Sequence, residues 1–142
     1  MKTQLIAAFA VALAGSVGAS AGCLEYGPVK VTLSGTISAR EDFGPPGYGE
    51  DPKHDSRERH LYLNLDNPVC VSARAGDDLD AAESGVDKME MVYFSPLPFQ
   101  HVWLGKHVSV TGTLFHGFSG HHWTRVLITP TETKLMTSDM KS

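Results

Sequence analysis

The sequence lacks an excess of basic residues, and it lacks a long apolar stretch in its main body. Its 12 lysine and arginine residues face 16 aspartate and glutamate residues, whereas a nucleic-acid binder needs a basic surface to release counterions from phosphates. No stretch approaches the ~20 apolar residues of a membrane-spanning helix. We therefore expect neither a nucleic-acid partner nor a transmembrane segment.

The apolar run that does occur lies at the start of the chain and predicts a secretory signal peptide. Residues 1–4 are short and basic, residues 5–13 are apolar, and Ala19-Ser20-Ala21 is a small-x-small cleavage pattern. We expect residues 1–21 to be removed, and residues 22–142 to form one domain, monomeric and periplasmic or secreted. Removing Lys2 takes the formal net charge from −4 to −5.

Cysteine is scarce, with only Cys23 and Cys70 in the chain. An even count in an exported protein predicts a disulfide, which would stabilise the fold by about 4 kcal/mol in the chain-entropy model. The alternative is acylation of Cys23, because Gly22-Cys23 ends the signal region. Ser20, where a lipobox has a large aliphatic residue, argues against acylation.

Alternation of apolar and polar residues predicts an all-β domain. Gly35 indicates a bend in the first strand, and Asn67-Pro68 interrupts the second. A long polar loop over residues 40–59, an acidic connection over 75–87 and a short helix within 95–104 join the strands, and residues 131–142 are expected to be a frayed tail. The five expected strands cover residues 29–39, 60–71, 88–94, 107–116 and 122–128.

This order of elements predicts a small five-stranded OB-like Greek-key barrel with one short helix between the third and fourth strands. Another small antiparallel barrel or sandwich is the alternative, because alternation identifies strands better than it identifies their partners. The first inter-strand loop and the last hairpin flank the usual binding face of such a barrel.

The register of the last hairpin follows from matching its apolar faces. Pairing Val110 with Ile128 leaves residues 117–121 as a loop of common length. It also places His116 opposite His122, and Phe115 opposite Trp123 as an aromatic cross-strand pair.

A histidine-rich hairpin tip suggests a zinc or copper site. His116 and His122 would share one ion, with His121 beside them in the loop. Against this, the chain has no His-x-x-x-His or Cys-x-x-Cys spacing. Further ligands would be His54, His60 or His101.

Aromatic residues beside the histidines suggest a surface that binds a small molecule, a glycan or a protein. The segment Gly44-Pro-Pro-Gly-Tyr48 would form a rigid lip that meets the hairpin tip. We therefore interpret the protein as a non-catalytic binding or accessory module, with a metal-binding protein as the alternative. The candidate binding residues are Phe43, Tyr48, Phe115, His116, His121, His122 and Trp123.

A small hydrolase is the second alternative. Ser119 precedes His121 and His122, but its glycine-flanked loop position is poor for a preorganised nucleophile. No catalytic motif stands out in the sequence, so the expectation leans away from an enzyme.

Several segments resemble one family, the exported bacterial proteins grouped as domain of unknown function family 4431. The resemblance implies an exported bacterial protein and lends no activity. Members often follow Gly-His-His with another histidine, where this chain has Trp123. The segments that carry the resemblance are Cys23-Leu-Glu-Tyr-Gly-Pro-Val, Val31-Thr-Leu-Ser-Gly-Thr-Ile37, Leu65-Asp-Asn-Pro-Val-Cys70-Val, Gly112-Thr-Leu-Phe-His116 and Gly120-His121-His122.

Overall fold

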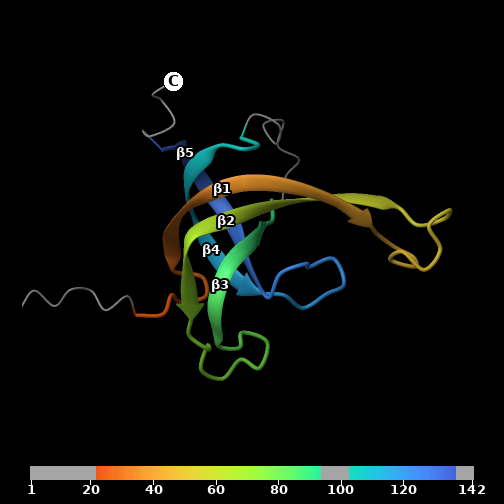
Figure 1. The fold of residues 1–142 in the computed structure, drawn as a ribbon. Helices are drawn as coiled ribbons and strands as arrows, with labels where there is room; N and C mark the ends of the chain where they lie inside the picture. Colours follow the sequence, from red (N-terminus) through yellow and green to blue (C-terminus); the bar gives the residue numbers. More distant parts are fainter. Residues whose placement is uncertain (1–21, 94–102, 137–142) are drawn as a thin grey trace, which may run out of the picture.

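Five strands form one sheet in the computed structural model, which describes residues 22–93 and 103–136 (Figure 1). They run in the order β1-β2-β3-β5-β4, and the pairing of β4 with β1 closes the sheet into a barrel. All neighbours are antiparallel except β3 and β5. The all-β prediction is confirmed. The strands are β1 (Lys30–Phe43), β2 (Arg57–Val71), β3 (Glu83–Met91), β4 (His107–His116) and β5 (Val126–Leu135).

Strand β1 curls around the barrel and pairs on both sides, as the bend at Gly35 predicts. Residues 30–36 pair with β4 and residues 35–43 pair with β2, so Gly35 takes part in both ladders. A Cβ atom at Gly35 would lie 2.2 Å from the carbonyl oxygen of Asn64. The missing side chain is therefore what lets the two strands approach closely enough at the point where β1 changes partners.

The inward residues of all five strands form one core. Val108 and Val110 of β4 are fully buried, and β3 adds Met89 and Met91. Alternation along each strand therefore identified the buried face correctly. The predicted core residues, all of them in this cluster, are Val31, Leu33, Leu61, Leu63, Val108, Val110, Leu114, Val126 and Ile128.

The predicted disulfide between Cys23 and Cys70 is present. It joins the segment before β1 to the end of β2. Leu24 reinforces the junction, because its N–H donates to the Cys70 carbonyl at 2.8 Å and its own carbonyl accepts from the Ser72 N–H at 2.8 Å. The first residues of the domain are thus fixed to the barrel.

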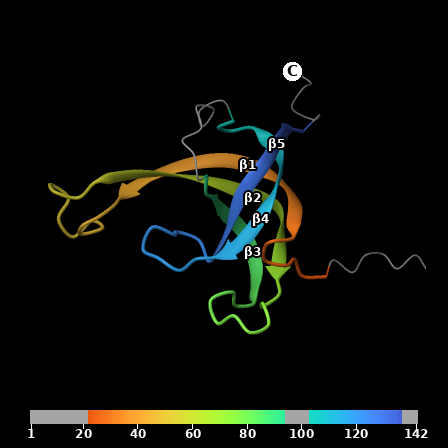
Figure 2. The same ribbon diagram turned by 180° about the vertical axis from the view of Figure 1, so that it is seen from behind.

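Several predicted boundaries are wrong because pairing continues where apolar alternation stops. Strands β1 and β2 extend outward as a two-stranded ribbon, which shortens the loop between them to residues 44–56 (Figure 2). Strand β3 begins at Glu83, inside the expected acidic connection. Residues 131–135 belong to β5 rather than to a frayed tail. Backbone hydrogen bonds hold these polar segments, so no hydrophobic pattern marks them.

The expected helix between β3 and β4 falls largely on residues 94–102, outside the described residues. Trp103–Gly105, which follow, form a turn. Across residues 22–93 and 103–136 the structure has no helix, and therefore none long and apolar enough to cross a membrane.

The predicted register of the last hairpin is wrong. Ile128 pairs with Leu114 instead of Val110, a shift of four residues, and His116 pairs with Val126. An even shift leaves every side chain on its original face, so the apolar pattern does not distinguish the two registers. The connection between β4 and β5 consequently lengthens to residues 117–125.

Replacing Gly35 by alanine should destabilise the protein by about 1–3 kcal/mol, because the added methyl group would overlap the Asn64 carbonyl. Chemical denaturation would measure the change. Gly120→Ala is the matched control, since its Cβ atom would lie 3.5 Å from the nearest atoms of Tyr48, an ordinary contact. Equal stability of Gly35→Ala and Gly120→Ala would contradict the close approach of β1 and β2.

Candidate functional site

Loop 117–125 lies over the outer face of the barrel. A row of outward-pointing residues crosses four strands there, since Tyr62 pairs with Glu90, Glu90 with Leu127, and Leu127 with Phe115. Tyr62, Glu90 and Leu127 are nevertheless buried, and none of them belongs to the core cluster. A Cβ atom on Gly117 would lie 3.4 Å from the Leu127 side chain, so the loop begins directly above this row.

A buried histidine and a buried glutamate lie beneath the loop. The Nδ1 atom of His60 is hydrogen-bonded to Oε1 of Glu90, and both side chains are more than nine-tenths buried. The loop completes the arrangement, because the Trp123 N–H donates to Oε2 of Glu90 at 2.7 Å and the Glu90 N–H donates to Oγ1 of Thr124 at 3.0 Å. The Trp123 ring packs on His60 with 5.1 Å between the ring centroids. The contacts of His60 and Trp123 with the carboxylate oxygens offset part of the cost of burying this side chain, and the Thr124 hydroxyl satisfies the Glu90 N–H.

Glu58 connects the His60–Glu90 pair to His121 of loop 117–125, and His121 in turn contacts loop 44–56. Its Oε2 lies 3.3 Å from Nε2 of His60, and its Oε1 lies 3.0 Å from Nδ1 of His121. The Tyr48 hydroxyl of loop 44–56 lies 3.4 Å from Nε2 of His121. The predicted meeting of the first inter-strand loop and the last hairpin tip therefore occurs at Tyr48 and His121. Figures 1 and 2 show both loops on the same side of the barrel.

Loop 44–56 is organised around one carboxylate. Asp55 accepts hydrogen bonds from the backbone N–H groups of Gly47 at 2.6 Å, Gly49 at 2.7 Å and Asp51 at 3.2 Å. Desolvation raises the pKa of Asp55, but these three donors outweigh it and the pKa is lowered. Tyr48 has a φ of 49°, in the left-handed region, and its ring projects from this hydrogen-bonded turn. Its side chain is exposed.

Phe43 does not join the exposed surface with Tyr48. The Arg57 guanidinium lies 4.1 Å from the centroid of its ring, and a Cβ atom on Gly49 would lie 3.5 Å from the ring. Phe43 is partly buried at the base of loop 44–56. It therefore supports the loop that presents Tyr48.

The three tip histidines have separate partners. Nε2 of His116 lies 2.9 Å from Oε1 of Glu83, whereas His121 contacts Glu58, and Nδ1 of His122 accepts the Phe118 N–H at 3.0 Å. The expected sharing of one ion by facing His116 and His122 rested on the wrong register. No three His, Cys, Asp or Glu side chains in the described ranges are placed to hold a metal ion.

The other histidines offered as metal ligands are also dispersed. His54 pairs with Asp51 within its own loop at 2.7 Å, and His60 contacts Glu90 and Glu58. His101 lies outside the described residues. The arrangement of the described histidines does not support the zinc or copper alternative.

The predicted pairing of Phe115 with Trp123 is also wrong. Phe115 packs against His122 and Phe118, with centroids at 5.4 Å and 6.2 Å, and Phe118 meets His122 edge-on at 4.5 Å. Trp123 lies over His60 instead. The Phe118 ring is 67% exposed, so this aromatic group carries apolar surface into solvent.

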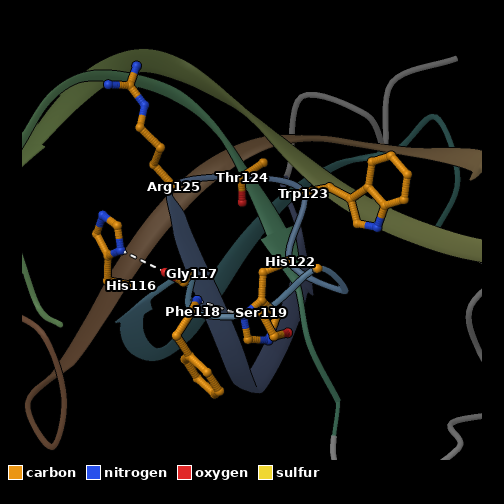
Figure 3. Close-up of a pocket in the computed structure, with 9 residues that line it drawn as sticks. His116, Gly117, Phe118, Ser119, His122, Trp123, Thr124 and Arg125 are labelled. Atoms are coloured by element: carbon orange, nitrogen blue, oxygen red, sulfur yellow. Dashed lines mark hydrogen bonds between the residues drawn. The ribbon is translucent and has the colours of Figure 1, made fainter. Parts of the chain in front are cut away.

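Residues 116–120 and 122–125 line an open hollow of about 510 Å³ (Figure 3). Its polar wall includes Arg125, whose Nη1 donates to Oε2 of Glu83 at 3.1 Å. Oγ of Ser119 accepts the backbone N–H of His121 at 3.3 Å. Among the described residues, no imidazole nitrogen contacts this hydroxyl as a general base would, and the geometry gives the hydrolase alternative no support.

Sequence reasoning missed the acidic residues that organise the site, Asp55, Glu58, Glu83 and Glu90. Glu58 and Glu90 are separated by 32 positions in the sequence, and only strand pairing brings them to the same face. Glu58 fell in the expected polar loop over residues 40–59. For Glu90 the available signal was its outward position in an alternating strand. That signal predicts exposure, which is the reverse of what Glu90 shows.

His116, at the end of β4, and His122, within loop 117–125, should titrate on opposite sides of pH 6.5. The hydrogen bond to Glu83 raises the pKa of His116, and burial lowers the pKa of His122. His116 therefore contributes stability below pH 6.5 that is lost as pH rises through its folded pKa. His122 contributes stability above pH 6.5 that is lost as pH falls through its folded pKa. Imidazole proton shifts followed by NMR across this range would measure both.

Glu83→Gln should lower the pH of the titration midpoint of His116, because the substitution removes the charged hydrogen-bond acceptor. Glu132→Gln is the matched control, since Glu132 lies in the exposed part of β5 and pairs with Lys134. A His116 midpoint below that of His122 in the unmodified protein would contradict the contacts described above.

A comparison with curated proteins found no match to this chain. One family does match, over a segment that holds β4, loop 117–125 and β5 except for its last two residues. It is the family that the Gly-Thr-Leu-Phe-His and Gly-His-His motifs indicated. Residues 99–133 match the sequence model of DUF4431, described as a domain of unknown function.

Proposed function

We propose that the protein is an exported, non-catalytic binding module of the OB type, and that loops 44–56 and 117–125 form its binding face. The order of its five strands is that of an OB barrel, in which the loops joining strands one and two and strands four and five flank the ligand. The net charge of −4 favours a glycan, a small molecule or a protein over nucleic acid.

The observation that carries this proposal is the contact between Tyr48 and His121. It joins the two loops into one continuous surface. The Tyr48 ring and the Phe118 ring, 45% and 67% exposed, stand on this surface, and the hollow along loop 117–125 lies beside them. Exposed aromatic rings next to polar hydrogen-bonding groups are typical of a recognition surface.

Export is part of the proposal. The basic, apolar and small-residue order of residues 1–21 supports it. The bond between Cys23 and Cys70 is compatible with an oxidising compartment. We place the protein in the periplasm or outside the cell, as a monomer.

The proposal can be tested by NMR titration of mature protein with a panel of soluble oligosaccharides and short peptides. Amide shifts should gather in residues 44–56 and 117–125. Tyr48→Ala and Phe118→Ala should each weaken binding about fivefold to a hundredfold, as truncation of an aromatic contact does. Leu79→Ala is the matched control, because Leu79 is an equally exposed apolar residue on loop 72–82.

Two outcomes would contradict the proposal. The first is that ligand-induced amide shifts gather on loop 72–82 while Tyr48→Ala and the unmodified protein bind with equal affinity. The binding face would then lie on loop 72–82 and not on loops 44–56 and 117–125. Turnover of an ester, amide or glycoside that Ser119→Ala or His122→Ala abolishes would make the protein an enzyme.

A further inference from the structure

Trp123 occupies the outer face of the barrel without being part of its core. Its ring lies on His60 and its backbone N–H is bonded to Glu90, yet it is absent from the hydrophobic core and from the partly buried residues that pack against that core. Its indole Nε1 is buried and has no hydrogen-bond partner among the described residues. A buried donor without a partner is unfavourable, so it reduces the stability of the Trp123 ring at this position.

The polar groups beneath Trp123 bind a short stretch of backbone. Glu90 accepts the Trp123 N–H through Oε2, and its own N–H donates to the Thr124 hydroxyl. Glu90 and the ring face of His60 thus contact an aromatic residue, Trp123, and Glu90 also contacts the hydroxyl residue that follows it, Thr124. We call the side chains of His60 and Glu90, with the Glu90 N–H, the Trp123 seat.

An unpaired strand edge continues from the Trp123 seat. On the side of β5, strand β3 pairs only through Glu90 and Met91, so Gly85–Lys88 have no strand partner there among the described residues. A hollow of about 220 Å³ lies between Gly85–Lys88 and Trp123–Val126. Gly85, Asp87 and Lys88 are exposed, and a Cβ atom on Gly85 would meet nothing within 4 Å. Gly85 has a left-handed φ of 61°, so the part of this edge that is open to an added strand is residues 86–88.

We propose that the Trp123 seat and the free edge of β3 form a second binding site, for an extended peptide that carries an aromatic residue. The aromatic ring of the peptide takes the place of Trp123 on His60, and its backbone pairs with residues 86–88 by strand addition. Loop 117–125 fills the site in the free protein with its own Trp123-Thr124 segment. This site lies beneath the loop, whereas the binding face proposed above is the exposed surface of the same loop.

The structure argues for a peptide through the segment already seated there. A main-chain N–H, an aromatic ring and a hydroxyl occupy adjacent positions in Trp123 and Thr124, and a peptide in which a hydroxyl residue follows an aromatic residue supplies all three. At the tip of the loop the contacts lie near solvent, where His121 meets Glu58 and Tyr48. His121, which bonds to Glu58, has a side chain 52% exposed. An incoming segment therefore displaces a loop whose removal leaves the core intact.

The test is a titration of mature Trp123→Gly protein with the peptide acetyl-Trp-Thr-Arg-Val-amide, the sequence of residues 123–126, followed by amide shifts. The variant should bind at least about tenfold more tightly than the unmodified protein, in which Trp123 competes. Shifts should gather in residues 85–90. Acetyl-Ala-Thr-Arg-Val-amide has the same charge and should bind the variant about tenfold more weakly, because it lacks the ring.

Leu79→Gly is the matched control protein, since it removes an exposed apolar residue from loop 72–82, outside the Trp123 seat, and it should bind as the unmodified protein does. If Trp123→Gly does not fold, His121→Ala carries the test, because it frees the loop from Glu58 and should raise affinity over the unmodified protein. Equal affinity of the variant and the unmodified protein would overturn the proposal. Shifts confined to residues 44–56 and 117–121 would also overturn it, while leaving the exposed binding face in place.

Discussion

The closure of the sheet at β1 is the constraint on which the rest of the structure depends. One strand has to pair with β4 over its first half and with β2 over its second half. The change of partner is sterically allowed because Gly35 carries no side chain against the Asn64 carbonyl. Once β1 has joined the two neighbours, the inward residues of all five strands face one core, and loops 44–56 and 117–125 emerge on the same side (Figure 1).

Loop 117–125 covers part of the outer face of the barrel and buries the residues beneath it. Residues that alternate with the core point away from it, yet Tyr62, Glu90 and Leu127 are covered. Burial of Glu90 is tolerated because His60, the Trp123 N–H and Thr124 all bond to it. The same contacts explain why the loop adopts one arrangement, since a buried carboxylate without partners would cost several kcal/mol.

This layered arrangement relates the two proposed sites to one loop. The outer surface of loop 117–125 meets Tyr48 through His121, and its inner surface contacts His60 and Glu90 through Trp123. A ligand on the outer surface would hold the loop down, whereas a peptide beneath it would lift the loop. Binding at the two sites would therefore be opposed, because each ligand favours a different position of the same residues.

The sequence by itself determined the strands, their buried faces and the disulfide, because alternation is a local property and two cysteines allow one pairing. The meeting of the two loops followed from the order of the elements, which is that of an OB-like barrel. It could not determine the hairpin register, since a shift of four residues leaves Val110 and Leu114 equally buried. That shift lengthened loop 117–125, separated His116 from His122 and placed Trp123 over His60. Only the tertiary structure decided that outward residues such as Glu90 would be buried, because covering by a distant loop leaves no mark on the alternation of β3.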